Sequence, residues 1–332
     1  MSVENQGELA ANQQAPAQQV RGQQATDRDY SPIEQESLRE ATRRYRQGRG
    51  SDLTEGELAH IRERVEELKR EQNAVVLAHY YVPAETQALA DYVGDSFYLA
   101  RLARTLDCST IVLAGVSFMA ESAKMLNPAR TVLNPEPRAD CPMAHMVRKA
   151  DVEAVRAQYD DLAVVCYVNS TAEIKSWSDV CVTSSNALKV VRELPQHNIL
   201  FIPAAVEALE VAHPDAEVCA HPECSEEVLR EASYIGSTKQ IIEHIAQAPE
   251  GTEFIVLTVV GVAAEIARLT KGQDKRVYFP ATPPICPNMA MVGPEKVLDA
   301  LEHNTGEVQL PAPEVNDAAA RTLDRMLELA AR

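Results

Sequence analysis

Basic residues are scarce in this sequence of 332 residues, and lysine is the scarcer of the two. Asp and Glu number 49 against 32 Lys and Arg, which gives a formal net charge of −17, and only nine of the basic residues are lysines. This deficit argues against a general DNA or RNA binder, because phosphate contacts require a basic face. An acidic surface with little lysine is typical of a salt-rich cytosol, so the composition predicts a halophile.

Long apolar runs and the common phosphate-binding glycine motifs are also missing. No apolar run reaches the roughly 18 residues of a membrane-spanning helix, and the first residues lack the basic start and apolar core of a secretory signal. We therefore expect a soluble, cytoplasmic protein. Neither G-x-G-x-x-G nor G-x-x-x-x-G-K-[ST] occurs, so the sequence gives no support for nucleotide binding.

The pattern of apolar and polar residues changes at residue 74. Residues 1–30 are rich in Gln and Ala and are predicted to form a disordered tail, and helical patterns cover 33–47 and 54–71. After residue 74, short β-branched runs alternate with helical segments, and an amphipathic helix is expected over 313–330. Buried parallel strands linked by helices have this pattern, so we predict an α/β fold.

Three segments of the sequence share one frame. They are AHYYVPAETQALADYVGDS, CYVNSTAEIKSWSDVCVTSS and AHPECSEEVLREASYIGST. In each, a ring-bearing leading residue is followed 17 positions later by a hydroxyl; the pairs are His79 and Ser96, Tyr167 and Ser184, and His221 and Thr238. We interpret the frame as a strand, a loop, a helix and a second loop. The side chain just past each strand is then expected at the carboxyl edge of its sheet, where open α/β sheets bind ligands.

A second repeat places cysteines at equivalent positions. Cys141 lies 30 residues after Ile111 and Cys286 lies 31 residues after Ile255, and each is followed by Pro and then a Met-Ala pair. The middle copy restarts at Ile199 but is about 34 residues short, because its leading residue is 54 positions from the next one rather than 88. The missing part is where its own cysteine should stand.

The repeats predict three pseudo-symmetric αβα domains with short parallel sheets around a central site, the middle one truncated. The expected boundaries are a tail and first helix at 1–52, a first repeat at 53–147, a truncated second repeat at 148–212, and a third repeat with a C-terminal helix at 213–332. Asp91 and Asp179 share one offset in two repeats, and we expect a structural role for them.

Seven cysteines in a reducing cytosol are not expected to form lasting disulfides. One thiolate from each of three units is a plausible ligand set for a [4Fe–4S] cluster, which would leave one iron open as a Lewis acid. The alternatives are buried loop cysteines, or a zinc site built from Cys219, His221 and Cys224 with His213 as a fourth ligand.

Over residues 56 to about 330 the sequence resembles the quinolinate synthases, the A proteins of de novo NAD biosynthesis. The resemblance is carried by the three repeat segments above, by GVSFMAESAKMLNP and by the segment around Cys286. It implies three similar αβα domains around a [4Fe–4S] cluster. It also implies a condensation of iminoaspartate with dihydroxyacetone phosphate to quinolinate, with loss of phosphate and water, downstream of an aspartate oxidase or dehydrogenase.

The resemblance also implies roles for individual residues. Two of the three cluster ligands match Cys141 and Cys286, and Glu223 matches the general base, with Tyr81 and His221 beside it in the acid–base work of the condensation. Substrate binding falls on side chains from all three repeats: His79, Tyr81, Ser96, Tyr167, Asn169, Ser184, His221, Glu223 and Thr238.

One segment departs from the family pattern. Family members carry a Trp-Pro-Gly-x-Cys-x-x-His stretch with the third cluster cysteine, whereas here AAVEALEVAHPDAEV stands in its place and the only Trp is Trp177. Cys181, Cys219 and Cys224 are possible substitutes, and Cys224, in the loop after Glu223, is the best placed. The rival hypothesis is a degenerate, non-catalytic member without cluster chemistry. A zinc hydrolase on the same fold is a third.

Overall fold

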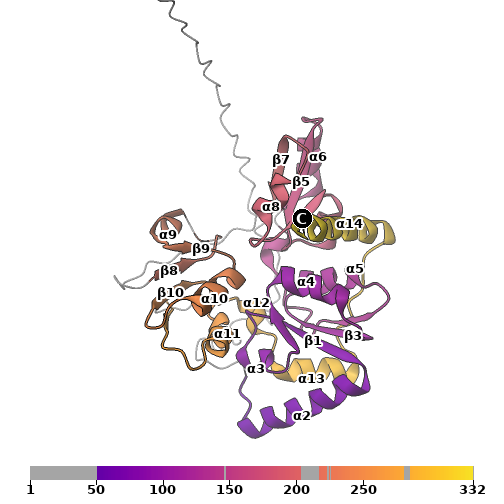
Figure 1. Ribbon diagram of the computed structural model, residues 1–332. Helices are drawn as coiled ribbons and strands as arrows, with labels where there is room; N and C mark the ends of the chain where they lie inside the picture. The colour runs from indigo at the N-terminus through magenta and orange to yellow at the C-terminus, as the bar shows by residue number, and fades with distance from the viewer. Residues whose placement is uncertain are drawn as a thin grey trace, which may run out of the picture.

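The computed structural model describes residues 51–145, 147–202, 217–222, 224, 226–279 and 285–331. The tail, the helix predicted at 33–47 and the candidate residues Glu223 and His213 lie outside the described residues. Within them the chain forms three small parallel sheets with helices packed around them (Figure 1). This architecture confirms the predicted α/β class.

The first unit contains a four-stranded parallel sheet in the order β2-β1-β3-β4. It begins with α2 (Glu55–Glu71), whose N-terminus is closed by a capping box between Thr54 and Glu57. The remaining elements, in chain order, are β1 (Ala74–His79), α3 (Ala84–Gln87), β2 (Tyr92–Gly94), α4 (Ser96–Thr105), β3 (Thr110–Ala114), α5 (Ser117–Leu126), β4 (Thr131–Leu133) and a 3₁₀ turn, η1 (Pro142–His145).

The second unit has three strands in the order β6-β5-β7. Its elements are α6 (Lys149–Arg156), β5 (Leu162–Tyr167), α7 (Ala172–Ser176), β6 (Val180–Val182), α8 (Ala187–Arg192) and β7 (Asn198–Ile202). By register, β7 is the counterpart of β3, since each pairs in parallel with the central strand of its unit. β3 is fully buried and has β4 on its outer side, whereas β7 is an edge strand among the described strands, and its Phe201 is 39% exposed.

The third unit again has four strands, in the order β9-β8-β10-β11. Its elements are β8 (Glu217–Ala220), α9 (Glu226–Glu231), β9 (Tyr234–Ile235), α10 (Thr238–Gln247), β10 (Glu253–Leu257), α11 (Val262–Leu269), β11 (Arg276–Tyr278) and α12 (Pro287–Ala290). The two final helices lie on the other units: α13 (Pro294–His303) packs against α2, and α14 (Pro313–Ala331) packs along α7 (Figure 1).

A repeated hydrogen bond accounts for part of the sequence repeat. The Asp91 carboxylate accepts the backbone N–H of Val76 at 2.8 Å, and Asp179 accepts that of Val164 at 2.7 Å, in each case 15 residues earlier in the chain. Asp91 also forms a salt bridge with Lys69 of α2 at 2.7 Å, and Asp179 forms one with Arg156 of α6 at 2.8 Å. In each unit this helix precedes the central strand. Asp91 and Asp179 therefore tie a helix, a loop and a central strand together, which is a structural role.

Candidate active site

The site is built at the carboxyl ends of the three central strands. His79 is the last residue of β1, Tyr167 is the last residue of β5, and His221 directly follows β8. Because all strands within a sheet are parallel, the loops after them gather at one edge of each sheet. The contacts below show which of these loops meet one another.

A phenol from the first unit reaches two hydroxyls of the third. The Tyr81 hydroxyl lies 2.8 Å from Thr238 Oγ1 and 3.1 Å from Thr258 Oγ1. Thr238 is the first residue of α10 and Thr258 directly follows β10, and both threonines are buried. Thr258 was not among the predicted site residues. Its position one residue past a central strand, the same as that of His221, is the signal that identifies it.

A second contact joins the middle unit to the third. Ser184 Oγ lies 3.2 Å from His221 Nε2, and the backbone N–H of Ser184 donates to the Tyr167 hydroxyl at 3.1 Å. The Ser184–Tyr167 contact lies within one unit and joins two residues 17 positions apart. The structure thus brings five predicted residues into two cross-unit contacts, Tyr81 with Thr238 and the Tyr167–Ser184 pair with His221.

The two histidines are neutral. His79 and His221 are 6% and 8% exposed. Burial lowers the pKa of His79 to about 3, with a smaller contribution from the nearby His221, and lowers the pKa of His221 to about 4. The His79 Nδ1 atom accepts the backbone N–H of Tyr81 at 3.1 Å, and the two rings pack edge-to-face with centroids 4.5 Å apart. At neutral pH both imidazoles are therefore uncharged.

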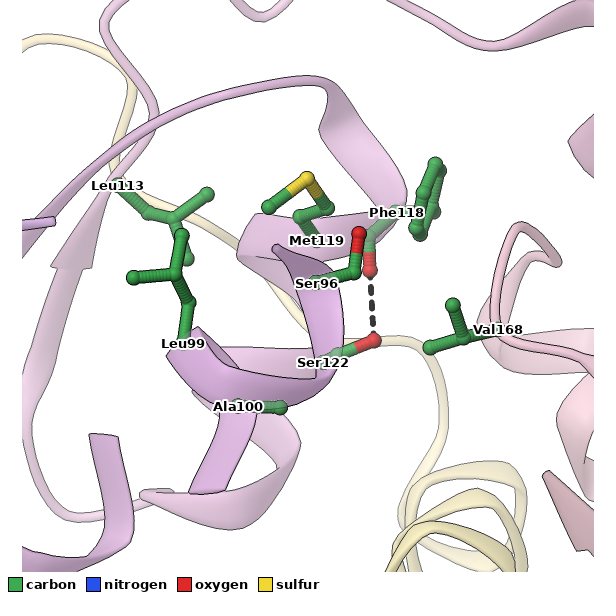
Figure 2. Close-up of a pocket in the computed structure, with 8 residues that line it drawn as sticks. All are labelled: Ser96, Leu99, Ala100, Leu113, Phe118, Met119, Ser122 and Val168. Carbon is green, nitrogen blue, oxygen red and sulfur yellow. Dashed lines mark hydrogen bonds between the residues drawn. The ribbon is translucent and has the colours of Figure 1, made fainter. Parts of the chain in front are cut away.

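Ser96 is not part of either contact between units. It lines a small, mostly apolar cavity between α4, α5 and the middle unit, where Figure 2 shows it beside Met119 and Phe118 with Val168 across from them. Among the described residues it forms no hydrogen bond with Ser184 or Thr238. The 17-residue offset places Ser96 and Thr238 at the same position, the first residue of a helix, but does not bring their hydroxyls into contact.

The predicted cluster thiols occupy two loops. Cys141 is buried beside Asn169, whose amide nitrogen is 4.0 Å from the sulfur, and its backbone N–H donates to Asp140 at 2.8 Å. Cys286 caps the short helix α12, and burial raises the pKa of its thiol. The Cys224 sulfur lies 3.5 Å from the carbonyl of Leu257, and the side chain packs against the core of the third unit.

In the part of the chain that the structure describes, no group of three His, Cys, Asp or Glu side chains is close enough to hold a metal ion. The counterpart of the third family cysteine falls in the segment after β7, and the sequence has no cysteine between Cys181 and Cys219. The same absence of a metal-binding group gives the zinc hypothesis no support among the described residues. Cys219 is fully buried within β8.

The structure is an α/β fold of three αβα units, with rings and hydroxyls in contact between the units. Within the described residues no helix is long and apolar enough to cross a membrane. The family model described as "Quinolinate synthetase A protein" matches residues 63–208 and 204–328. The chain belongs to the quinolinate synthase family.

Three curated relatives agree with this assignment. The quinolinate synthase of Fusobacterium nucleatum is 42% identical over 306 residues, covering 81% of this chain and 99% of the relative. Quinolinate synthase 2 of Methanosarcina acetivorans is 38% identical, covering 81% of this chain and 96% of that protein. The enzyme of Aquifex aeolicus is 35% identical, with 84% and 97% covered.

Proposed function

We propose that this chain binds iminoaspartate and dihydroxyacetone phosphate among its three units and condenses them to quinolinate with loss of phosphate and water. The observation that carries the proposal is the pair of contacts between units, Tyr81 with Thr238 and Ser184 with His221. Each joins residues that the family resemblance assigns to the substrate. The reaction places the enzyme in the cytoplasm, downstream of an aspartate oxidase or dehydrogenase.

The groups at these contacts suit the chemistry of the substrates. Both substrates are anions, and hydroxyls together with the backbone N–H groups at the start of α10 bind carboxylate or phosphate oxygens without a counter-charge. The neutral imidazoles of His79 and His221 each carry one ring nitrogen that donates a hydrogen bond and one that accepts near pH 7. The Tyr81 phenol, held between two threonine hydroxyls, orients the ligand. Glu223 remains the proposed general base.

The family generally uses an iron–sulfur cluster, which supplies a Lewis-acidic iron to the condensation. In this chain Cys141 and Cys286 are the proposed ligands, with Cys224 a weak third. Because the sequence has no cysteine between Cys181 and Cys219, where the family pattern has the third ligand, the proton-transfer and binding roles above are assigned to the protein's own side chains alone.

A second candidate is a family member that has lost cluster chemistry through an internal deletion in the middle unit. The edge position and exposure of β7, whose counterpart β3 is covered, support it. The family match also divides at residues 204–208, just after β7. Finally, the 306 aligned residues of the Fusobacterium relative exceed 81% of a 332-residue chain, as an internal gap would produce.

Quinolinate formation by the purified chain decides between the two. The protein is prepared anaerobically, incubated with iron and sulfide, and supplied with enzymatically generated iminoaspartate and dihydroxyacetone phosphate, and quinolinate is measured by chromatography. An active chain supports the first candidate. An inactive chain that becomes active after about 34 residues with a cysteine are restored behind β7 supports the second. Inactivity of both versions contradicts the proposed reaction.

A further inference from the structure

We infer that Gln87 and Lys175 are equivalent positioning residues: each fixes the loop that carries its unit's substrate-facing side chains and anchors that loop to the neighbouring unit. We call these contacts the bracing of the loop, and the structure shows them directly. The consequence of the bracing for ligand binding rests on the proposed function.

Gln87 ends helix α3 and is 7% exposed. Its side-chain nitrogen donates to the carbonyls of Tyr80 and Val82, each at 2.9 Å, in the loop that follows β1. The same nitrogen reaches the carbonyl of Gly261 at 3.1 Å, at the start of α11 in the third unit. One amide therefore closes the loop that holds His79 and Tyr81 and attaches it to the unit whose hydroxyls contact Tyr81.

Lys175 lies in helix α7 and is fully buried. Its ammonium group donates to the carbonyl of Ser170, whose own hydroxyl donates to the Tyr167 carbonyl at 2.8 Å. It also lies 5.4 Å from the ring centroid of Phe118, at the start of α5 in the first unit. Within the described residues no carboxylate pairs with it. Burying a charge without a counter-ion costs free energy, so we expect the contacts of Lys175 to have a role that offsets this cost.

The two side chains occupy the same place in the repeat. Gln87 lies eight residues after His79, and Lys175 lies eight residues after Tyr167. Each donates to the carbonyl of the third residue after that ring, Val82 or Ser170. Their partners across the unit boundary also correspond. Phe118 is seven residues after Ile111 in β3, and Gly261 is six residues after Ile255 in β10, so both partners mark the start of the equivalent helix. Unrelated contacts would not correspond both in the loop carbonyl that is bound and in the partner across the unit boundary.

The third unit has no such donor, because Leu229 stands at this offset. The bracing therefore serves two loops, which carry His79 with Tyr81 and Tyr167 with Asn169. Groups that hold a ligand must be fixed to within about 0.5 Å, and a loop without its carbonyl anchor does not meet that limit. Loss of either donor is expected to loosen its own loop and leave the sheets intact.

Exchanging the two donors tests this inference. Gln87→Met and Lys175→Met remove the donor, whereas Gln87→Lys and Lys175→Gln replace each donor with the one used by the other unit. Amide hydrogen exchange is followed in residues 80–82 and 168–171 of the full chain, and quinolinate binding is measured by calorimetry. We expect each Met variant to raise the amide exchange rate in its own loop by about tenfold. The dissociation constant for quinolinate should also rise by about tenfold. The exchanged variants stay within about threefold of the wild type.

Matched controls separate bracing from general stability. Thr86→Val and Ser178→Ala each remove an adjacent buried hydroxyl that binds the carbonyl of Val292 or Ile174 instead of a loop carbonyl. They are expected to leave loop exchange unchanged even where they lower the melting temperature. Wild-type exchange in both Met variants, or equal loss in the exchanged and Met variants, overturns the inference. If Lys175→Met does not fold, Lys175→Gln and the Gln87 pair still decide it. If the wild type binds no quinolinate, the proposed function fails, whereas loop exchange still tests the bracing.

Discussion

The buried imidazoles of His79 and His221 link the stability of the protein to pH. An unfolded chain protonates histidine near pH 6.5, whereas burial lowers the pKa values of these two in the folded state to about 3 and about 4. Between these limits the unfolded state binds more protons, so the free energy of unfolding falls as the pH falls. Each histidine is expected to remove about 1.4 kcal/mol between pH 7.5 and 5.5.

Urea unfolding at the two pH values checks this expectation. Substituting Gln for His221 should make the loss of stability between pH 7.5 and 5.5 smaller by about 1.4 kcal/mol. The substitution His60→Gln, at an exposed position of α2, is the control and should leave the loss unchanged. An equal pH dependence in the His221 variant and the wild type contradicts a neutral, buried imidazole at this position.

Glu223 is the second residue whose role is testable alone. Glu223→Gln keeps the shape of the side chain and removes the carboxylate, so turnover of the chain, or of a version with the middle unit restored, should fall by about 10²-fold or more. Glu250→Gln, in an exposed turn after α10, is the matched control. Near-normal turnover of the Glu223 variant removes this residue from acid–base work.

At the scale of elements, the edge strand β7 is the feature most exposed to association. Its backbone has an unpaired side among the described strands, and the Phe201 ring is 39% exposed. Uncovered apolar edge strands pair with other chains. Phe201→Lys is therefore expected to reduce self-association at concentrations of about 100 μM, measured by light scattering after size exclusion, where a substantial oligomer fraction is expected for the wild type.

The control for this prediction is Leu269→Lys, which changes a side chain of similar exposure, 37%, at the end of a helix. It should leave association as in the wild type. A monomeric wild-type chain, or equal effects of the two lysines, shows that β7 is not the associating surface.

The alternation of strands and helices was predictable from sequence because parallel strands are buried on both faces and read as short apolar runs. The common frame also identified which rings lie at the carboxyl end of a central strand: Tyr167 is the last residue of β5 and His221 directly follows β8. It did not identify partners across units. Tyr81 meets Thr258 as well as Thr238, and Ser96 faces Val168, because such contacts depend on how the units dock and not on the spacing within one of them.

At the scale of the whole molecule, three units surround one site but supply two matched thiols. Thiolate ligation is what secures iron in a cluster, and the family's cluster cysteines are matched in this sequence at Cys141 and Cys286 only. A [4Fe–4S] cluster held by these two cysteines has two irons without a protein ligand. The chain as it stands is therefore predicted to bind the cluster weakly or not at all.

Iron and sulfide analysis after anaerobic reconstitution measures this directly. We expect well under four irons per chain, with rapid loss to a chelator, and a further decrease in Cys224→Ala if that thiol acts as a partial substitute. Restoring about 34 residues with a cysteine behind β7 should recover four irons, because the third thiolate then returns to the unit that lacks it. Cys108→Ala, a buried core thiol beside β3, is the control. Four stable irons in the unrestored chain, unchanged in Cys224→Ala, would contradict both the weak-cluster prediction and the role of Cys224.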